Sequence, residues 1–263
     1  MVPVMSARRA ATRDLQRGLA LLYEDRDILV VDKPPGLLTM GTDSEKTRTA
    51  YFILTNYVRK GHRKSRNRIF IVHRLDRETS GILVFAKTIE AKLYLQQHWD
   101  TTEKKYLAVV HGRMKKETEI ISTYLAENKA NLVYRTSDRS KGRLSRTAYR
   151  VLKQNKDVAL LEVDLLTGRK HQIRVHLADI GHAVVGDTRY GKDNRGYRNL
   201  ALHAHSLSFT HPVTGERLTF KTNAPAYFNQ LVGNLESRPH GFIEDQSKSG
   251  NTLCRPKGET AQN

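Results

Sequence analysis

The chain of 263 residues contains very little cysteine and no long hydrophobic stretch. Its single cysteine, Cys254, can form no internal disulfide and no multi-cysteine metal site, which favours a reducing compartment and a cytoplasmic location. No apolar run approaches the roughly 18–20 residues that a membrane-spanning helix requires, so we expect no membrane span. Residues 1–22 contain arginines but no continuous apolar segment, which is not the pattern of a secretory signal peptide.

The sequence also lacks the usual cofactor-binding signatures. It has no glycine-rich dinucleotide fingerprint, no phosphate-binding loop, no nucleophile-elbow serine and no zinc-protease helix motif. His171 and His176 are five residues apart, and His203 and His205 alternate along an expected strand. Because no cysteine or carboxylate cluster accompanies them, structural or RNA-facing histidines are favoured over a zinc site. We therefore expect a reaction without a cofactor and without a metal.

Negative charge is scarce relative to positive charge. The chain has 45 Lys and Arg against 27 Asp and Glu, a formal net charge of +18. Such an excess favours a polyanionic partner, because lysine and arginine displace counterions from phosphates. The alternative is a basic surface that is merely solvated. Membrane-surface binding is disfavoured, because no strongly amphipathic basic helix is evident.

The composition divides the chain into three parts. Residues 1–20 form a polar, basic N-terminal extension, and residues 21–236 show the alternation of a single folded domain. Residues 237–263 are rich in Ser, Gly, Lys, Pro and Gln, which predicts a disordered tail. The overall content of 38% hydrophobic and 27% charged residues is typical of a globular domain.

Runs of β-branched and other apolar residues predict several strands. We expect them over Asp27–Asp32, Gly81–Ala86 and Tyr106–His111, each closed by a turn or a glycine. Thr147–Leu152 and Val158–Leu166 are expected to pair as a hairpin. Many strands mixed irregularly with few helices indicate an α+β domain rather than a doubly wound parallel sheet.

Two helices can be placed next to these strands. Thr88 is a plausible N-cap, and Ala91, Leu95 and Trp99 fall on one face of the helix that it begins. A second helix is indicated by apolar residues at i, i+4 and i+7, which are Ile173, Leu177 and Ile180. Gly181 would end this helix.

Three segments carry more charge than a core requires. The first, His73–Gly81, places Asp76 among arginines directly before an expected buried strand. Nearby positive charge stabilises the ionised carboxylate, which suits a nucleophile or base better than a general acid. A surface salt bridge is the alternative, and spacing alone favours neither.

The other two segments also allow two interpretations. In Lys104–Tyr106 the tyrosine is either a core residue or a stacking platform for a base. Thr167–Arg174 crosses a junction from strand to helix and is loaded with hydrogen-bond donors. Positive charge at a helix start opposes the helix dipole, so an anion, either a phosphate or a partner carboxylate, is expected there.

These segments resemble the motifs of the RluA-like family of RNA pseudouridine synthases. Six segments match the family in the same order, namely VVDKPPGLL (Val30–Leu38), HRLDRETSG (His73–Gly81), KKY (Lys104–Tyr106), TGRKHQIRVH (Thr167–His176), GHAVVGDTRYG (Gly181–Gly191) and LALHAHSLSFTHP (Leu200–Pro212). The resemblance extends from about Leu21 to Leu235. It implies a pseudouridine synthase fold, with a mixed, largely antiparallel sheet, flanking helices and a central catalytic cleft.

The resemblance also implies an activity. The family isomerises specific uridines to pseudouridine in large-subunit rRNA, in tRNA or in both, without cofactor or metal. Asp76 would be the nucleophile, attacking either the ribose or the base. Arg174 would pair with Asp76, and Tyr106 would stack on the uracil and take part in the final proton removal. Arg74 would fill the gap left when the target nucleotide is flipped out of its helix.

The remaining candidate residues concern RNA binding by an enzyme that we expect to be a monomer. Leu202 would form part of the apolar wall of the pocket. Contacts with RNA are expected from basic residues near the two main motifs, which are Arg63, Lys64, Arg66, Arg169 and His171. A non-catalytic RNA-binding module is the main alternative. A two-carboxylate glycoside hydrolase is disfavoured, because Glu78 lies too close to Asp76 in the sequence.

Overall fold

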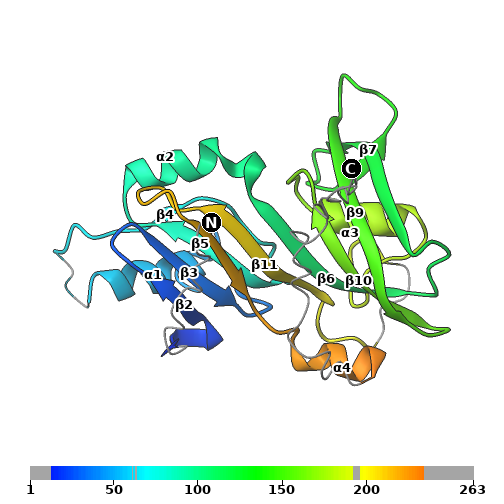
Figure 1. Ribbon diagram of the computed structural model, residues 1–263, viewed down its shortest axis with the longest axis horizontal. Coiled ribbons are helices and arrows are strands. Elements are labelled where there is room, and N and C mark those ends of the chain that lie inside the picture. Colours follow the sequence, from blue (N-terminus) through cyan, green and yellow to red (C-terminus); the bar gives the residue numbers. More distant parts are fainter. Residues whose placement is uncertain (1–12, 61, 63, 192–195, 234–263) are drawn as a thin grey trace, which may run out of the picture.

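The computed structural model describes residues 13–60, 62, 64–191 and 196–233. In this part of the chain, one continuous sheet of 12 strands spans the molecule, and helices lie against it (Figure 1). Its strand order is β1-β2-β3-β5-β11-β6-β10-β9-β7-β8, with β12 on β11 and β4 on β5. Strands β5 and β11 pair in parallel, and the other pairings among the described strands are antiparallel. The α+β class and the mixed, largely antiparallel sheet are therefore confirmed.

The strands are β1 (Arg13–Asp14), β2 (Ala20–Glu24), β3 (Ile28–Lys33), β4 (Phe70–Ile71), β5 (Ser80–Ala86), β6 (Glu103–His111), β7 (Thr118–Glu127), β8 (Val133–Thr136), β9 (Arg143–Gln154), β10 (Val158–Leu165), β11 (Leu202–Thr210) and β12 (Arg217–Lys221). The α-helices are α1 (Ala50–Val58), α2 (Ile89–Gln97), α3 (Gln172–Asp179) and α4 (Ala226–Val232). Two short 3-10 helices are η1 (Gln16–Gly18) and η2 (Trp99–Thr101).

Strand β5 lies at the centre of the half of the sheet that holds α1 and α2 (Figure 1). All of its residues are buried, because successive side chains point to opposite faces and both faces are covered. Leu83 contributes to the core that contains Leu54 of α1, whereas Val84 contributes to the core that contains Leu95 of α2. Burial on both faces explains why this strand reads as a continuous apolar run rather than an alternating one.

The elements predicted from the sequence are present with small changes in their ends. The strand expected over Asp27–Asp32 is β3, and the expected hairpin is the antiparallel pair β9 and β10. Thr88 is the N-cap of α2, and its hydroxyl accepts a hydrogen bond from Ala91 N–H. The expected alignment of Trp99 with this helix is wrong, because α2 ends at Gln97 and Trp99 lies in η2.

Part of the segment assigned to the N-terminal extension contacts the sheet. Arg13 pairs with Leu21 across β1 and β2, and Leu19 is fully buried in the core. Apolar residues at positions 15 and 19 account for this contact, since they can be buried against the neighbouring strands. The tail expected over residues 237–263 lies outside the described residues, as does Arg63.

Gly81 brings the two halves of the sheet together. Its φ is +113°, and a Cβ at this position would lie only 2.3 Å from the carbonyl oxygen of Ala204 in β11. Glycine is therefore required where β5 and β11 pair in parallel through Gly81 and Ala204. This close approach places the loop before β5 beside the start of β11, where Leu202 lies.

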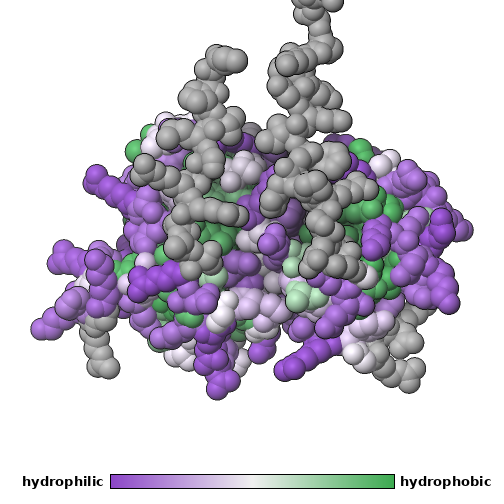
Figure 2. Space-filling model, turned by 60° about the horizontal axis from the view of Figure 1, so that its bottom comes forward, coloured by the Kyte–Doolittle hydropathy of each residue, from purple (hydrophilic) through white to green (hydrophobic). Residues whose placement is uncertain are grey.

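Hydrophilic side chains cover most of the described surface in Figure 2, and hydrophobic side chains show in smaller patches between them. None of the helices in the described ranges has the length and the apolar character needed to cross a bilayer.

Candidate active site

The loop before β5, which carries the aspartate of the HRLDRETSG motif, is held by the turn that follows β3. Lys33 at the end of β3 is fully buried, and its Nζ donates to the carbonyl oxygens of Leu37 (2.8 Å) and Arg77 (3.2 Å). The Gly36 N–H donates to the same Arg77 carbonyl at 2.8 Å. Burial lowers the pKa of Lys33 to about 7, although nearby carboxylates oppose this shift. The Lys-Pro-Pro-Gly turn thus acts as a support for the loop.

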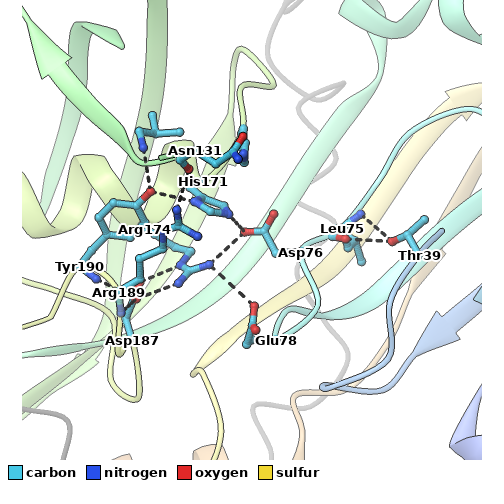
Figure 3. Close-up of polar contacts among 12 residues, drawn as sticks. Thr39, Leu75, Asp76, Glu78, Asn131, His171, Arg174, Asp187, Arg189 and Tyr190 are labelled. Carbon is cyan, nitrogen blue, oxygen red and sulfur yellow. Dashed lines mark hydrogen bonds and ion pairs between the residues drawn. The ribbon is translucent and has the colours of Figure 1, made fainter. Parts of the chain in front are cut away.

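A second contact fixes the residue before Asp76. The hydroxyl of Thr39 donates to the Leu75 carbonyl at 2.9 Å, and the Leu75 N–H lies 3.2 Å from the same hydroxyl (Figure 3). The Thr79 N–H then donates to the carbonyl of Asp76, which closes a turn. These main-chain contacts hold Asp76 at a defined place while leaving its side chain 25% exposed.

Arg174 of α3 reaches Asp76 from the other side of the site. Its side chain is only 5% exposed, and its Nη1 lies 3.3 Å from Asp76 Oδ2. Its Nε and Nη2 donate to the two oxygens of Asp187 at 2.7 and 2.8 Å (Figure 3). Burial alone would lower the pKa of Arg174, but the hydrogen bonds and charges of Asp187 and Asp76 raise it. Arg174 is therefore a permanent cation.

Asp187 is the main site residue that the sequence analysis missed. It is 1% exposed, and besides Arg174 it accepts hydrogen bonds from the N–H groups of Arg189 and Tyr190. Burial raises its pKa, but these bonds and the charge of Arg174 hold the pKa of Asp187 below its usual value. The signal in the sequence was its place in the GHAVVGDTRYG segment, one of the matching motifs. Nothing in that segment indicates its partner.

Tyr106 of β6 lies in the wall of the site. It is 9% exposed and pairs across the sheet with Ala204 of β11 and Val163 of β10. Burial raises the pKa of Tyr106, and the negative charge of Asp76 raises it further. The side chain is therefore an uncharged phenol at neutral pH. Leu202, 3% exposed, lines the same cavity.

These side chains surround a cavity of about 360 Å³. That volume falls within the usual range for a site that holds a small molecule or a single base. Seven of the ten predicted site residues line it, which are Arg74, Asp76, Tyr106, Arg169, His171, Arg174 and Leu202. Among the described residues that line the cavity, Asp76 is the single acid.

The basic run that precedes the catalytic motif lies elsewhere. Arg66 and Arg68 line a different, larger cavity of about 1430 Å³, together with Tyr57 and Phe70. The two cavities lie at opposite ends of β5. Lys87, which follows β5, lines the larger cavity, whereas residues that precede β5 line the Asp76 cavity. The seven residues of β5 span about 23 Å between these ends. The structure thus does not bring the predicted RNA-binding residues into one group.

His176 and His203 behave as structural side chains. His176 contacts the hydroxyls of Thr123 and Thr147, each at 2.9 Å. His203 contacts Ser80 and Thr222 in the same way, also at 2.9 Å. Burial lowers the pKa of His176 to about 4 and that of His203 to about 3, so both are neutral.

Comparison with known proteins supports the resemblance seen in the sequence. Residues 27–179 match the family model described as RNA pseudouridylate synthase. An uncharacterised RNA pseudouridine synthase of Mycoplasma genitalium is 36% identical, over 82% of this chain and 70% of that protein. The ribosomal large subunit pseudouridine synthase D of Nitrosomonas europaea is 34% identical, over 86% of this chain and 67% of that protein.

A solved structure shares the fold. The human RNA pseudouridylate synthase domain containing 4 superimposes with a TM-score of 0.67 at 24% identity, covering 79% of this chain and 89% of that chain. The family model and the two relatives agree on the same chemistry. The chain belongs to the RluA-like family of RNA pseudouridine synthases, which are isomerases that act on RNA.

Proposed function

We propose that this enzyme isomerises specific uridines in structured RNA with Asp76 as its nucleophile. One observation carries the proposal. The accessible carboxylate of Asp76 lies in the cavity, with its Oδ2 3.3 Å from the buried guanidinium of Arg174. The ionised form is the one that attacks, and the arginine lies beside it as a cation. In the reaction the N1–C1′ bond breaks, the uracil turns, a C5–C1′ bond forms and C5 loses its proton. Attack at the ribose and attack at the base both use the same carboxylate.

The walls of the cavity suit a pyrimidine ring. Tyr106 offers an aromatic surface for stacking, and Leu202 offers an apolar contact. The raised pKa of Tyr106 makes its phenolate unfavourable in the free enzyme, which favours stacking as its first role. A role in removing the C5 proton requires the phenol to give up its own proton first, and burial opposes that loss more than the charge of Asp76 does.

Arg74 is well placed to occupy the position of a flipped nucleotide. It is exposed at the mouth of the cavity, two residues before Asp76, and has no carboxylate partner among the described residues. A base stacked inside a helix cannot reach a carboxylate within a cavity, so the target must leave its stack. An unpaired guanidinium can then hydrogen-bond to the orphaned base or to the neighbouring phosphates.

The substrate we propose is large-subunit rRNA, tRNA or both. One relative is named as a ribosomal large subunit synthase, which supports rRNA. The larger cavity beside β4 adds Arg66 and Arg68, which would hold phosphates about 23 Å from the target uridine. A stacked strand advances about 3.4 Å per phosphate, so this corresponds to about six to seven nucleotides. A monomeric, cytoplasmic enzyme remains our expectation.

The test is the isosteric substitution Asp76→Asn. It should abolish tritium release from 5-labelled uridine in RNA while leaving the melting temperature and RNA affinity nearly unchanged. Asp164→Asn, the same change at a 43% exposed carboxylate on β10, is the matched control and should keep wild-type turnover. Turnover by Asp76→Asn at the wild-type rate would refute the proposal. A wild-type protein that binds RNA without any turnover would favour the binding-only alternative.

Mapping of pseudouridines in total RNA, with and without the protein, identifies the substrate. A uridine whose modification depends on the wild type and is lost with Asp76→Asn is a direct target. The position of that uridine relative to nearby helices then shows whether a segment of about six to seven nucleotides can reach the larger cavity.

A further inference from the structure

A second line of polar contacts reaches Asp76 through His171, the N-cap residue of α3. The His171 side chain is 9% exposed, and its Nε2 lies 3.7 Å from Asp76 Oδ2. Its Nδ1 lies 2.8 Å from the hydroxyl oxygen of Tyr190. The backbone of His171 is left-handed, with φ 53° and ψ 15°, a conformation that costs about 1–2 kcal/mol for a residue with a side chain. The strain is tolerated at the residue whose ring faces the reactive carboxylate.

One tautomer of His171 joins these contacts into a single line of hydrogen bonds. The main-chain N–H of Val133 donates to the Tyr190 hydroxyl oxygen at 3.2 Å. With its proton on Nε2, His171 accepts the tyrosine's own proton at Nδ1 and turns a donor toward Asp76. The positioning role described below requires this tautomer.

His171 faces groups of both signs. Burial lowers the pKa of His171, and the charges of Arg174, Arg189 and Lys170 lower it further, whereas Asp76 opposes this shift. The ring is therefore neutral at pH 7 and acts as a hydrogen-bond donor rather than as a cation. Tyr190 is fixed in turn, because the guanidinium of Arg174 lies over its ring at 5.3 Å from the centroid.

Arg174 by itself leaves Asp76 free to rotate. Two of its donors are committed to Asp187, so a single group, Nη1, contacts Asp76. The terminal torsion of an aspartate is broad, and one contact does not fix it. Figure 3 shows that the lines from His171 and from Arg174 end on the same oxygen of Asp76, Oδ2.

We propose that His171, oriented by Tyr190, is a positioning residue that holds Asp76 Oδ2 together with Arg174 and thereby presents Oδ1 as the attacking oxygen. This inference rests on the proposed role of Asp76 as the nucleophile. The two donors fix the plane of the carboxylate, so that one oxygen is engaged and the other faces the cavity. The contact from Nε2 shortens to a full hydrogen bond when substrate closes the site, as is common for catalytic contacts that are long in the free enzyme.

Two substitutions of His171 separate positioning from a merely structural role. Asparagine tolerates the left-handed backbone better than glutamine does, but its amide ends near the position of Nδ1. Glutamine fits the backbone less well, but its amide nitrogen reaches the position of Nε2 and can donate to Asp76. Positioning therefore predicts that His171→Gln is more active than His171→Asn, whereas a structural role predicts the reverse order.

The measurement is steady-state tritium release over a range of RNA concentrations, which yields kcat and KM, with RNA affinity and melting temperature determined in parallel. We expect His171→Asn to lower kcat by about 10²-fold, the usual cost of a misplaced reacting group, with KM nearly unchanged. His171→Gln should recover part of this loss. Tyr190→Phe keeps the ring under Arg174 but removes the hydroxyl that orients the histidine, and should lower kcat less than His171→Asn does. His182→Asn, at a histidine outside the cavity, is the matched control.

The order of the two variants in kcat, with KM nearly unchanged, is the readout that a merely structural role does not reproduce. The positioning role would be overturned if His171→Asn were as active as His171→Gln or more active. It would also be overturned if the substitutions changed only KM. If Asp76→Asn is itself active, the proposed function fails first. If Asp76→Asn is inactive and both His171 variants keep the wild-type kcat, the positioning role alone fails.

Discussion

Removal of one charge from the Arg174–Asp187 pair should cost the protein much of its stability. The substitution is Asp187→Asn, which keeps the size of the side chain but removes its charge. Asp187 is 1% exposed and accepts hydrogen bonds from two groups of Arg174 and from two main-chain N–H groups. Breaking a buried pair in this way typically costs about 3–5 kcal/mol, because the remaining charge is left without its partner. That is a large fraction of the roughly 5–15 kcal/mol of a typical domain.

Urea unfolding at pH 7 measures this loss directly. The matched control is Glu103→Gln, which removes a 66% exposed carboxylate that pairs with Arg217 at 2.7 Å on the surface. An exposed pair contributes about 0–1 kcal/mol, so the control should unfold close to the wild type. If Asp187→Asn unfolds at the same urea concentration as Glu103→Gln, the buried pair does not stabilise the fold and the reasoning fails.

The pH dependence has a definite sign. The pKa of Asp187 is lower in the folded protein than its unfolded value of about 3.9. Between the two values the unfolded state binds more protons, so the contribution of Asp187 is fully present above about pH 4 and is lost as the pH falls through the folded pKa. The difference in stability between wild type and Asp187→Asn should therefore be constant at neutral pH and should shrink only below about pH 4. If the difference in stability already shrinks at pH 6, the pH dependence arises from a titratable group other than Asp187.

Three further predictions concern other parts of the molecule. Gly81→Ala should lower the melting temperature by about 5 °C or more, because its Cβ meets the Ala204 carbonyl; an unchanged Tm would show that the two strands separate easily. Lys33→Met should lower the free energy of unfolding by about 1–3 kcal/mol and should also lower kcat, because three main-chain carbonyls lose their hydrogen-bond donor. Urea unfolding and turnover that both match the wild type would contradict this prediction. Replacing Arg66 and Arg68 by Ala should reduce the salt slope of RNA binding by about 1.4–1.8 in filter-binding titrations, with kcat at saturating RNA unchanged; an identical slope would show that this run is only a solvated loop.

Local signals in the sequence were sufficient for the elements that carry the main motifs. β5 was predicted because its apolar run is bounded by a glycine and a helix N-cap, and both features have local causes. Asp76 was placed correctly at the entrance of this strand for the same reason. Helix α1 was not predicted, because Ala50–Val58 contains aromatic and β-branched residues that read as strand. Burial of Ile53 and Leu54 in the core decides its conformation, and such tertiary contacts are not visible in a single sequence.

The candidate site shows the same limit. The arginine expected to pair with Asp76 does so, but its principal partner is Asp187, thirteen residues further along the chain. The local sequence does not show whether an aspartate forms a buried ion pair or only caps a turn. In both cases its carboxylate accepts hydrogen bonds from main-chain N–H groups of the residues that follow it. The distinction depends on which side chain of α3 points toward the turn, and that depends on the packing of α3 against β7, β8 and β9.

Arg174 lies within 4 Å of three carboxylates, those of Asp187, Asp76 and Glu78, and the difference between the nearest two fits the proposed role of Asp76. Asp187 is buried with four hydrogen bonds, so its lone pairs are occupied and it has no access to the cavity. Asp76 keeps 25% of its side chain exposed and shares one oxygen between Arg174 and His171, so its other oxygen stays available. A buried carboxylate without a cation would take up a proton, and a buried cation without a carboxylate would be costly. Because Asp187 fixes Arg174 as a rigid cation, Asp76 has a positive charge beside it without being held in a full bidentate pair, and an incompletely paired carboxylate suits the nucleophilic attack that we propose.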